Sequence, residues 1–457
     1  QLWQPPVAAG DFDAKEGDVV CVWSSSPEEK RLLLLGLGEK EKVTAERLRR
    51  AWSELTKFCR KQKIKTLNVL LPEIESLPRP IAARAIVEGL FLGNYVYDVH
   101  KLEPASLVEQ ITLIASDVHA IEEIVDKVTK VMAAVWLARD LCNGNADDIT
   151  PQYLSQIAQE IAKEHPRAEA ACHGRSWIEE KGMGLLLAVS RASCREPTFI
   201  CMHYNGNPSS PDRTCLVGKG ITYDTGGLSL KPMASMETQR IDMSGAAIAL
   251  AVFKAVSALN LHINLSIAIP SCENAIGSMA YKIGDVYKGY SGKTVEVTNT
   301  DAEGRLILAD AIAYAVKELP ISRIIDIATL TGAVDVALGG EAVGLFSNSD
   351  FLAEELIASG QRTFERAWRL PLYEEYKELL KSDTADIKNA SGRSAGAILG
   401  AIFLQEFVED TPWAHFDIAG CAYNKEAKRY LPKQATAVGV RLLVDYLEHL
   451  EKKEAVT

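Results

Sequence analysis

Acidic residues gather in two short stretches of this sequence, and each stretch also carries basic residues. The first stretch holds Lys219, Asp224 and Lys231, and Asp242 follows at the head of an apolar helical pattern. Four glycines lie between Gly218 and Gly227. Glycine lets a chain turn tightly and lets a ligand approach the backbone closely. This stretch is therefore predicted to form an active-site loop.

The second stretch runs from Asn299 to Arg305 and contains two further acids, Asp301 and Glu303. It lies between a strand-like alternation at 294–297 and a helical pattern at 306–316. We expect the stretch to be extended, and in extended chain residues two apart point the same way. Asp301, Glu303 and Arg305 are then predicted to share one face.

Clustered carboxylates repel one another strongly in a poorly solvated cleft, and hard divalent cations usually compensate them. Asp224, Asp242, Asp301 and Glu303 carry four negative charges, which would match two divalent ions. Lys231 and Arg305 remain to hold a developing oxyanion and a bound anion. The two stretches together therefore predict a metal-binding cleft with room for two ions.

Other interpretations of these motifs are possible. A strand-terminal Asp can be only a helix cap, and a glycine-rich segment can be only a turn. The eight histidines contain no H-E-x-x-H motif, so we do not expect a histidine-bound zinc protease, and we interpret His415 as structural. The run Gly292-Lys293-Thr294 resembles the end of a phosphate-binding loop, but Tyr287 stands where such a loop requires glycine, so no nucleotide site is expected.

The elements that must position these residues indicate two α/β domains. Residues 1–118 alternate apolar runs with helical patterns such as Ala45 to Lys61, which predicts a smaller N-terminal α/β domain. Residues 119–142 repeat apolar residues at helical spacing and predict one long connecting helix. The apolar runs of the first domain are 19–23, 32–37, 67–71 and 111–115.

Residues 143–457 are predicted to form a larger catalytic α/β sandwich with a mixed sheet. Thr150 can cap a helix that Pro151 starts and that continues to Ala162. A further helix is expected at 245–256. The predicted buried strands are 185–189, 198–202, 214–217, 263–269, 294–298, 324–328 and 342–346.

Composition narrows the class of protein. The net charge of −11 argues against a general nucleic-acid surface, and no stretch reaches the roughly 18 apolar residues of a membrane span. Nine cysteines without a C-x-x-C pair favour reduced thiols. The first residues, Gln1 to Pro6, show no secretory-signal pattern. We therefore expect a soluble, cytoplasmic protein without a membrane partner.

Asn299 to Leu306 resembles the signature octapeptide of the leucine aminopeptidase (cytosol aminopeptidase) family. The spacing of Lys219, Asp224, Lys231 and Asp242 is similar to the same family, as are the segments 328–333 and 413–420. The resemblance covers about residues 139 to 445 closely, whereas the N-terminal part is similar only in its macro-like architecture. It implies a metal-dependent leucyl aminopeptidase that removes N-terminal residues from peptides.

Carried over residue by residue, the resemblance implies that Asp224 and Glu303 bridge two metal ions. Lys219, as a neutral amine, and Asp242 would complete the tight site, and Asp301 would complete the exchangeable site. Lys231 would stabilise the oxyanion, and Arg305 would hold a bicarbonate that acts as general base. The metals are expected to be Zn²⁺ or Mn²⁺, and Co²⁺ also suits such a site.

The resemblance also implies a pocket for the first side chain of the substrate and a homohexameric assembly. A leucine-like preference is expected, but Gln239 stands where the family often has Met, which predicts a more polar or adaptable pocket. The predicted pocket residues are Gln239, Asn299, Thr329, Gly332, Ala419 and Ala422.

An alternative function is a DNA-binding accessory protein on the same fold. Some bacterial members of the family have such a role, through surfaces that include the N-terminal domain. Its support in this sequence is the basic group Lys57, Arg60, Lys61, Lys63 and Lys65. A run of charges is usually a solvated helix face, so nucleic acid is not the expected partner.

Overall fold

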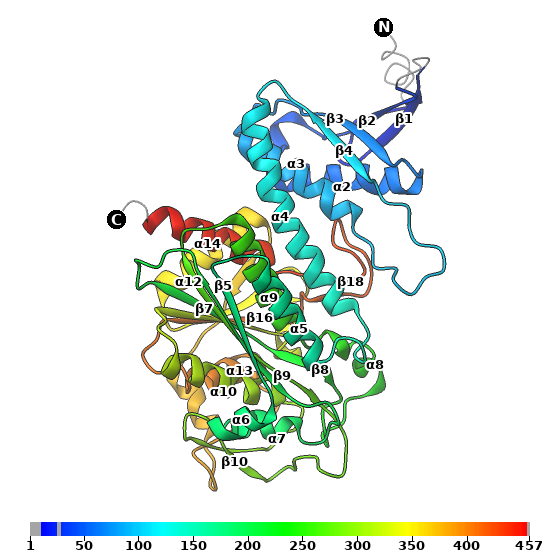
Figure 1. Cartoon of the computed structure of the whole chain (residues 1–457). Coiled ribbons are helices and arrows are strands. Elements are labelled where there is room, and N and C mark those ends of the chain that lie inside the picture. The colour runs from blue at the N-terminus through cyan, green and yellow to red at the C-terminus, as the bar shows by residue number, and fades with distance from the viewer. Residues whose placement is uncertain (1–10, 25–28, 455–457) are drawn as a thin grey trace. The chain divides into compact units, whose positions relative to one another are not determined.

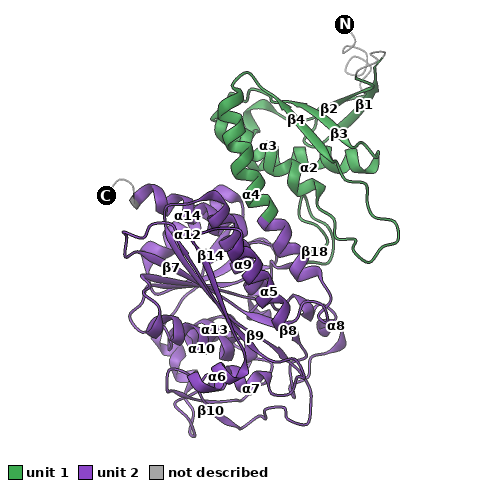
Figure 2. Cartoon of the chain, in the orientation of Figure 1, with its two compact units in different colours: residues 1–133, 424–434 green, residues 134–423, 435–457 purple. Residues whose placement is uncertain are grey.

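The computed structural model describes residues 11–24 and 29–454. The interpretation of Gln1 to Pro6 falls outside these residues. The chain forms two compact units: residues 1–133 with 424–434, and residues 134–423 with 435–457 (Figures 1 and 2). Both units mix helices and strands, and the second is the larger, which confirms the predicted fold class.

The first unit contains two separate two-stranded sheets. The strands β1 and β2 form an antiparallel hairpin, and β3 and β4 pair in parallel. All four predicted strands of this part are confirmed to within a residue or two. The elements are β1 (Val19–Trp23), β2 (Arg31–Leu35), η1 (Lys40–Lys42), α2 (Ala45–Lys61), β3 (Thr66–Leu70), α3 (Arg79–Asn94), β4 (Gln110–Ile114) and the start of α4 (Val118–Asn143).

The helix α2 follows from local sequence. The Thr44 side chain accepts a hydrogen bond from the Arg47 backbone N–H, which satisfies one of the free donors at the helix start. Apolar residues at helical spacing, including Leu48, Leu55 and Cys59, turn one face into the core of the unit. The predicted bounds of this helix are confirmed.

The segment 424–434 follows most of the second unit in the sequence but belongs to the first unit. Tyr430 donates a hydrogen bond of 3.0 Å to the buried carboxylate of Glu46 on α2. The Lys57 side chain, also on α2, donates to the backbone carbonyl of Arg429. The first unit is therefore built from two distant parts of the chain.

The second unit contains a mixed, nine-stranded sheet in the order β14-β13-β16-β12-β7-β9-β6-β5, with β8 paired to β9. Neighbours among β16, β12, β7, β9 and β8 run parallel, whereas β13 on β16, β6 on β9 and β5 on β6 are antiparallel. The strands are β5 (Ala168–His173), β6 (Thr198–Asn205), β7 (Arg213–Gly218), β8 (Gly220–Asp224), β9 (Asn264–Asn274), β12 (Arg323–Ala328), β13 (Val343–Ser347), β14 (Ala367–Arg369) and β16 (Trp413–Asp417).

Helices cover both faces of this sheet (Figure 1). One face carries α5, α9, α12 and α14, and the other carries α7, α10 and α13. The helices are α5 (Pro151–Lys163), α6 (Arg175–Lys181), α7 (Gly184–Ser190), α8 (Met233–Met236), η2 (Gln239–Ile241), α9 (Ser244–Leu259), α10 (Glu303–Glu318), α11 (Gly332–Leu338), α12 (Asp350–Thr363), η3 (Glu374–Leu380), α13 (Gly396–Gln405) and α14 (Val440–Glu454). Two small sheets, β10 (Val286–Lys288) with β11 (Thr294–Glu296) and β15 (Ile387–Lys388), and β17 (Tyr423–Asn424) with β18 (Gln434–Ala435), complete the elements.

One predicted strand of the second unit is wrong. Residues 185–189 form most of the helix α7, not a strand. The buried carboxylate of Asp310 accepts the backbone N–H groups of Leu185 and Leu186, both at 2.9 Å, and so caps the start of this helix from a distant element. A short apolar run does not distinguish a buried strand from a buried helix.

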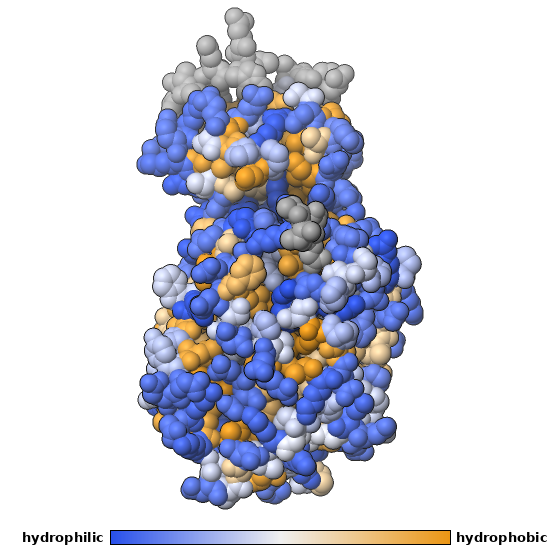
Figure 3. Space-filling view, turned by 90° about the vertical axis from the view of Figure 1, so that its left-hand side faces the viewer, coloured by the Kyte–Doolittle hydropathy of each residue, from blue (hydrophilic) through white to orange (hydrophobic). Residues whose placement is uncertain are grey.

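The surface shows no dominant apolar region on the face that Figure 3 displays, where apolar residues come to the surface in scattered groups among hydrophilic ones. Within the described ranges, none of the helices combines the length and the apolar character that crossing a membrane would require.

Candidate metal centre

The predicted ligands meet where several strands of the large sheet end. Lys219 lies between β7 and β8, Asp224 is the last residue of β8, and Thr329 follows the end of β12. Because these strands run parallel, their carboxyl ends open at the same edge, where ligands of α/β proteins usually bind. The fold thus collects residues that are more than 100 positions apart in the sequence.

The glycines of the first stretch have two different roles. Gly226 and Gly227 have φ angles of +85° and +62°, so they make the turn that follows Asp224. A Cβ at Gly218 would stand 2.6 Å from the backbone oxygen of Gly245, at the start of α9. This glycine instead permits a close approach between β7 and α9.

The prediction of an extended second stretch is wrong. The strand β11 ends at Glu296, and the helix α10 begins at Glu303, directly after Asp301 and Ala302. Glu303 and Arg305 therefore lie in the first turn of a helix, and they do not share a face with Asp301 by strand alternation. A carboxylate in the first turn of a helix is stabilised by the helix dipole. The sequence did not reveal that a helix starts at Glu303, because Gly304 indicated an extended chain.

Lys219 is surrounded by acceptors. Its Nζ lies 2.7 Å from Asp242 Oδ2 and 2.8 Å from Glu303 Oε1, and it donates to the Thr329 carbonyl at 3.0 Å. The Thr329 hydroxyl donates to Asp242 Oδ1 at 2.7 Å. Lys219, Asp242 and Glu303 are all buried. Lys219 is thus held by two carboxylates and a carbonyl.

Lys231 lies on the other side of the carboxylates. Its Nζ is 2.8 Å from Asp224 Oδ2 and forms a second ion pair with Asp301. The Lys231 side chain is 14% exposed, against 3% for Lys219. The Asp301 side chain is 33% exposed, which makes it the most exposed of the four carboxylates. The Lys231 and Asp301 pair therefore borders the open side of the cluster.

The pKa shifts indicate that the cluster holds more negative charge than its two lysines balance. Burial, together with Glu303, raises the pKa of Asp224 to about 6. Burial also raises the pKa of Asp242 and Asp301. Burial would likewise raise the pKa of Glu303, but Lys219 and Lys231 lower it to about 2.

For the two lysines, burial and the neighbouring charges shift the pKa in opposite directions. Burial alone would lower the pKa of Lys219 and Lys231, but the surrounding carboxylates raise both above their usual value. Two ammonium groups thus partly neutralise four carboxylates. A site with surplus negative charge at short range is one that a cation stabilises.

These residues fit a divalent metal ion. One oxygen each of Asp224, Asp242 and Glu303 lies within 4.8 Å of the others, and all three residues are buried. Hard carboxylate oxygens with one amine nitrogen suit Mn²⁺ or Zn²⁺. Among the described residues this is the one group of three or more acidic, His or Cys side chains with such spacing, and it contains no histidine.

A polar support around the carboxylates was not predicted. Asn274, at the end of β9, donates from Nδ2 to Asp224 Oδ1 at 2.8 Å and to the Thr300 carbonyl at 3.0 Å. Thr300 in turn donates to the Gly226 carbonyl at 2.7 Å, and Tyr281 donates to the Thr300 carbonyl at 2.7 Å. This network joins the two acidic stretches. Of these supporting residues, only Thr300 belongs to a motif that the sequence analysis singled out.

Arg305 is buried but makes no ion pair with the carboxylates. Its Nη1 donates to the Asn389 carbonyl at 2.8 Å, whereas its Nε has no hydrogen-bond partner among the described residues. Burial lowers the pKa of Arg305 to about 10 against the opposing effect of Glu303 and Asp417. The guanidinium therefore keeps its charge near neutral pH.

The predicted pocket residues fall into two groups. Thr329 and Asn299 contact two of the acidic residues. The Thr329 hydroxyl donates to Asp242, and the Asn299 side chain accepts the backbone N–H of Asp301 at 2.8 Å. No described hydrogen bond joins Gln239, Gly332, Ala419 or Ala422 to the carboxylates. The Gln239 side chain instead donates to the Ser235 carbonyl at 2.9 Å.

Asp417 ties two of the pocket segments together. Its carboxylate accepts the backbone N–H groups of Leu330 and Ala419 and the Thr331 hydroxyl, at 3.1, 3.2 and 2.6 Å. The loops after β12 and β16 are thereby held side by side. A Cβ at Gly332, the first residue of α11, would meet nothing within 4 Å, so this position faces open space.

Comparison with known proteins assigns this arrangement to a family. Residues 136–444 match the model of the cytosol aminopeptidase family, catalytic domain, and residues 4–104 match the model of its N-terminal domain. This chain belongs to the cytosol aminopeptidase family. It is accordingly a hydrolase of the leucyl aminopeptidase type, and the predicted recognition and enzyme class are confirmed.

Named relatives agree with this assignment. The chain is 49% identical to a probable cytosol aminopeptidase of Protochlamydia amoebophila (strain UWE25), over 96% of this chain and 89% of that protein. It is 44% identical to a probable cytosol aminopeptidase of Chlamydia abortus (strain DSM 27085 / S26/3), over 98% of this chain and 91% of that protein.

Two solved structures share the fold of this chain. The cytosol aminopeptidase from Coxiella burnetii matches with a TM-score of 0.86 and 35% identity, over 98% of this chain and 92% of that chain. The bottromycin maturation enzyme BotP in complex with Mn matches with a TM-score of 0.90 and 33% identity, over 98% and 96% of the two chains. The aminopeptidase family to which this chain belongs uses two divalent metals.

Proposed function

We propose that this protein is a two-metal aminopeptidase that releases N-terminal amino acids, with a leucine-like preference, from peptides. The observation that supports this most directly is the buried group of Asp224, Asp242 and Glu303 around Lys219, in a chain of the cytosol aminopeptidase family. Burying four carboxylates with only two lysines is costly in a purely structural core, and bound cations would offset that cost.

The ligands divide between two sites in this proposal. Asp224 and Glu303 would hold both ions, Lys219 and Asp242 would complete the tight site, and Asp301 would complete the exchangeable site. The burial of Lys219 and Asp242 and the partial exposure of Asp301 support this division, because an exposed ligand allows faster exchange.

The chemistry that two such ions supply when bound is Lewis acidity, which polarises the scissile carbonyl and lowers the pKa of water. The protein must first release a proton from Lys219, since only the neutral amine can be a ligand. Its Nζ forms ion pairs with Asp242 and Glu303, so it lies beside two carboxylates that would hold the same ion. Positive charge nearby lowers the pKa of an amine and drives this release.

Lys231 remains charged and stabilises the oxyanion of the tetrahedral intermediate. Its position at the open side of the cluster, 2.8 Å from Asp224, supports this role. Arg305 would hold a bicarbonate ion that supplies the general base. The unpartnered Arg305 Nε is the observation in favour of an anion there.

The substrate pocket is proposed to include Asn299, Thr329 and the loops after β12 and β16. Gly332, Ala419 and Ala422 are small enough to leave room for a side chain, and Gln239 would border that room. Recognition of the free α-amine at the metal centre would make the enzyme an exopeptidase.

Further parts of the proposal rest on the family resemblance and on the composition and hydrophobic pattern of the sequence. The physiological metal is Mn²⁺ or Zn²⁺, the location is the cytoplasm, and the assembly is a homohexamer. Residues 143–457 form the catalytic domain, residues 1–118 the N-terminal domain and residues 119–142 the connecting helix. Light scattering of the purified protein measures the assembly directly.

The DNA-binding alternative gains no support from the basic group on α2 and β3. Lys57 pairs with Glu54, Lys65 pairs with Glu109, and Arg60 donates to the Gly93 carbonyl at 2.9 Å. Three of the five basic side chains are thus engaged within the protein, whereas no ion pair is described for Lys61 or Lys63. Neutralising phosphates needs cations that are free to reach them.

The decisive experiment measures hydrolysis of leucine p-nitroanilide by metal-stripped protein with Mn²⁺, Zn²⁺ or Co²⁺ restored in turn. We expect no activity without metal, recovery with at least one ion, and loss of that recovery in Asp301→Ala. N-acetyl-leucine p-nitroanilide, which lacks the free amine, serves as the matched control and should not be cleaved. The proposal fails if no ion restores activity, or if Asp301→Ala behaves like the wild type.

A further inference from the structure

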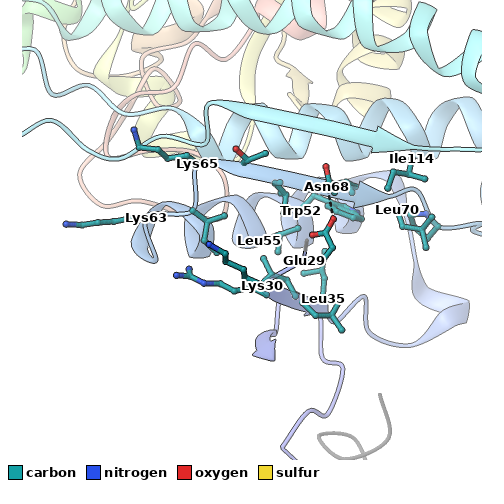
Figure 4. Close-up of a pocket in the computed structure, with 18 of the residues that line it drawn as sticks. Glu29, Lys30, Leu35, Trp52, Leu55, Lys63, Lys65, Asn68, Leu70 and Ile114 are labelled. Atoms are coloured by element: carbon teal, nitrogen blue, oxygen red, sulfur yellow. Dashed lines mark hydrogen bonds between the residues drawn. The ribbon is translucent and has the colours of Figure 1, made fainter. Parts of the chain in front are cut away.

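The residues that read the first side chain of a substrate must lie next to the metal centre, because the bond to be cleaved adjoins that first residue. The pocket that Figure 4 shows is lined by β2, β3 and α2 of the first unit, and none of its lining residues belongs to the metal centre. Thr329 is different, because its carbonyl accepts from Lys219 Nζ and its hydroxyl donates to Asp242. The chain that follows β12 therefore starts at the metal centre.

Two loops carry most of the proposed side-chain pocket. The first loop, residues 329–332, follows β12 and contains Thr329 and Gly332. The second loop, residues 418–422, follows β16 and contains Ala419 and Ala422. The strands β12 and β16 are parallel neighbours, with Ala328 opposite Asp417, so both loops leave the same edge of the sheet. The spacing of the two loops therefore sets the width of the proposed pocket.

Asp417, the last residue of β16, joins the two loops through its carboxylate. Its Oδ1 accepts the backbone N–H groups of Leu330, Thr331 and Ala419 at 3.1, 3.4 and 3.2 Å. Its Oδ2 accepts the Thr331 hydroxyl at 2.6 Å. Among the described residues, no other side chain is hydrogen-bonded to both loops. The first loop is therefore tied to the second by one buried side chain.

The chemistry of these contacts calls for a carboxylate. Four donors face Asp417, and a carboxylate is the side-chain group whose two oxygens only accept. An asparagine offers one oxygen, so its NH₂ group would face either the Thr331 hydroxyl or the backbone N–H groups. A buried N–H group that loses its acceptor is costly, so the loop would shift to find another partner.

Thr331 extends this link to the helix α11. Its Oγ1 donates to Asp417 and also accepts the Val334 N–H at 3.2 Å, which caps the start of the helix. Gly332 is the first residue of α11. Asp417 thus fixes the start of α11, and with it the position of Gly332 in the proposed pocket.

The first loop is also supported from the side of α13. A Cβ at Gly400 would stand 3.0 Å from Leu330 Cδ2, 3.2 Å from Thr331 Cγ2 and 3.4 Å from Arg305 Nη2. Glycine at position 400 therefore lets α13 approach the loop and the Arg305 guanidinium closely. The loop is held by Asp417 on one side and packed against α13 on the other.

The second loop is a compact turn that its own backbone holds. The Ile418 N–H donates to the Ala328 carbonyl at 2.9 Å, and the N–H groups of Cys421 and Ala422 donate to the Ile418 carbonyl at 2.9 and 2.8 Å. This turn does not need the Asp417 carboxylate to keep its shape. The carboxylate instead determines where the first loop lies relative to the turn.

We propose that Asp417 is a positioning residue that sets the width of the pocket for the first side chain of the substrate. It thereby determines the preference for long apolar side chains over alanine. No described hydrogen bond or ion pair joins Asp417 to the residues of the metal centre, so it acts through the two loops. This inference rests on the proposed function.

The test compares wild type and Asp417→Asn, both as full-length, Mn²⁺-loaded protein, on leucine and alanine p-nitroanilides. The KM for the leucine substrate should rise about tenfold, because its side chain fills the space between the loops. The KM for the alanine substrate should hardly change, since a methyl group fills little of that space. The kcat values and the affinity for Mn²⁺ should stay close to those of the wild type. A general loss of stability would not change the ratio of the two KM values.

Asp310→Asn is the matched control. Asp310 is an equally buried carboxylate, and it accepts three backbone N–H groups, those of Leu185, Leu186 and Tyr290, at 2.9, 2.9 and 2.8 Å. It supports α7 and contacts neither pocket loop. The variant should lower the unfolding temperature as Asp417→Asn does, but it should leave the ratio of the KM values unchanged.

A second pair of variants tests the Thr331 hydroxyl. Thr331→Val removes the donor to Asp417 at nearly constant volume and should shift the ratio of the KM values in the same direction as Asp417→Asn. Thr331→Ser keeps the hydroxyl and should keep the wild-type ratio. If Asp417→Asn does not fold, this pair decides.

The outcomes separate this inference from the proposed function. A wild-type protein that cleaves neither substrate with any metal overturns both. An active wild type whose ratio of KM values is unchanged in Asp417→Asn and in Thr331→Val overturns the inference and leaves the function standing. An equal shift of the ratio in Asp310→Asn also overturns it, because the effect would then follow from lost stability. A lower affinity for Mn²⁺ with an unchanged ratio would assign Asp417 to the support of the metals instead.

Discussion

A Cβ on residue 304 would stand 2.4 Å from Lys219 Cε and 2.7 Å from Lys219 Nζ. Glycine at this position of α10 therefore leaves the space in which the Lys219 amine reaches Asp242 and Glu303. Gly304 directly follows Glu303 in the segment that resembles the family signature, and this contact gives a physical reason for glycine there.

Gly304→Ala is predicted to displace Lys219 while the protein stays folded. Alanine is favoured over glycine within a helix by about 1 kcal/mol, so the unfolding temperature should not fall much. Metal affinity and activity should drop about 10- to 100-fold, because the amine no longer reaches its place. Gly174→Ala, where a Cβ meets nothing within 4 Å, is the matched control and should leave metal affinity unchanged.

Asn274→Ala is predicted to weaken metal binding without removing any ligand. Asn274 orients Asp224 and the Thr300 segment by its two donated hydrogen bonds. Loss of such a supporting residue typically costs 10- to 100-fold in metal affinity or activity, that is, about 1 to 3 kcal/mol. Titration with Mn²⁺ measures this. Thr222→Val removes a buried hydroxyl that has no described partner, and an equal loss in that control would contradict the prediction.

Gln239→Met is predicted to shift the substrate preference toward large apolar N-terminal residues. Met has no amide to hold to the Ser235 carbonyl, so its side chain is free to pack against substrate. A panel of aminoacyl p-nitroanilides should show kcat/KM rising for leucine relative to alanine, by a factor of a few. An unchanged ranking would mean that residue 239 does not read the side chain.

The thermal stability is predicted to depend on pH through His415. This buried histidine contacts Asp326 at 2.5 Å; burial would lower its pKa, but Asp326 raises it above the ordinary 6.5. The folded protein then holds the proton more tightly than the unfolded chain. The stabilisation is complete below pH 6.5 and is lost as the pH rises through the raised value.

The comparison for this effect is His415→Gln. The difference in unfolding temperature between wild type and variant should be largest below pH 6.5 and should shrink toward alkaline pH. A difference that stays constant from pH 5 to pH 9, a range chosen to span the ordinary pKa of about 6.5, would show that Asp326 does not hold a charged imidazole.

Cys194 is predicted to be the thiol that reacts fastest in the folded protein. It is exposed, whereas the other cysteines are buried or half-buried, and burial raises the pKa of Cys59 to about 11 and of Cys142 to about 12. Ellman's reagent should label about one thiol quickly, and all nine in guanidinium. Cys194→Ser should abolish the fast phase. Persistence of that phase would assign it to another cysteine.

The sequence predicted which acidic residues lie together better than it predicted the local backbone around them. Residue type and spacing sufficed to bring Asp224, Asp242, Asp301 and Glu303 together, because their motifs sit at the ends of strands that the hydrophobic pattern also marks. The backbone at Glu303 was predicted wrongly as extended, because a glycine within a helix start has the same local signature as a glycine that ends a strand.

Contacts between distant elements could not be predicted. Asn274 and Asp417 lie outside the two acidic stretches, and neither their type nor their spacing indicates that they contact Asp224 and the Leu330 segment. The helix α7 is a similar case, because Asp310 caps it from more than 100 residues away. Such pairings exist only once the sheet has formed.

The chain passes between the two units three times, because residues 424–434 belong to the first. The first unit therefore lacks Tyr430 and its hydrogen bond to Glu46 until the ribosome has made almost the whole protein. Domains usually fold in the order of their synthesis. Here the N-terminal unit is completed only after most of the second unit has been made, and a fragment cut within α4 would not contain all of it.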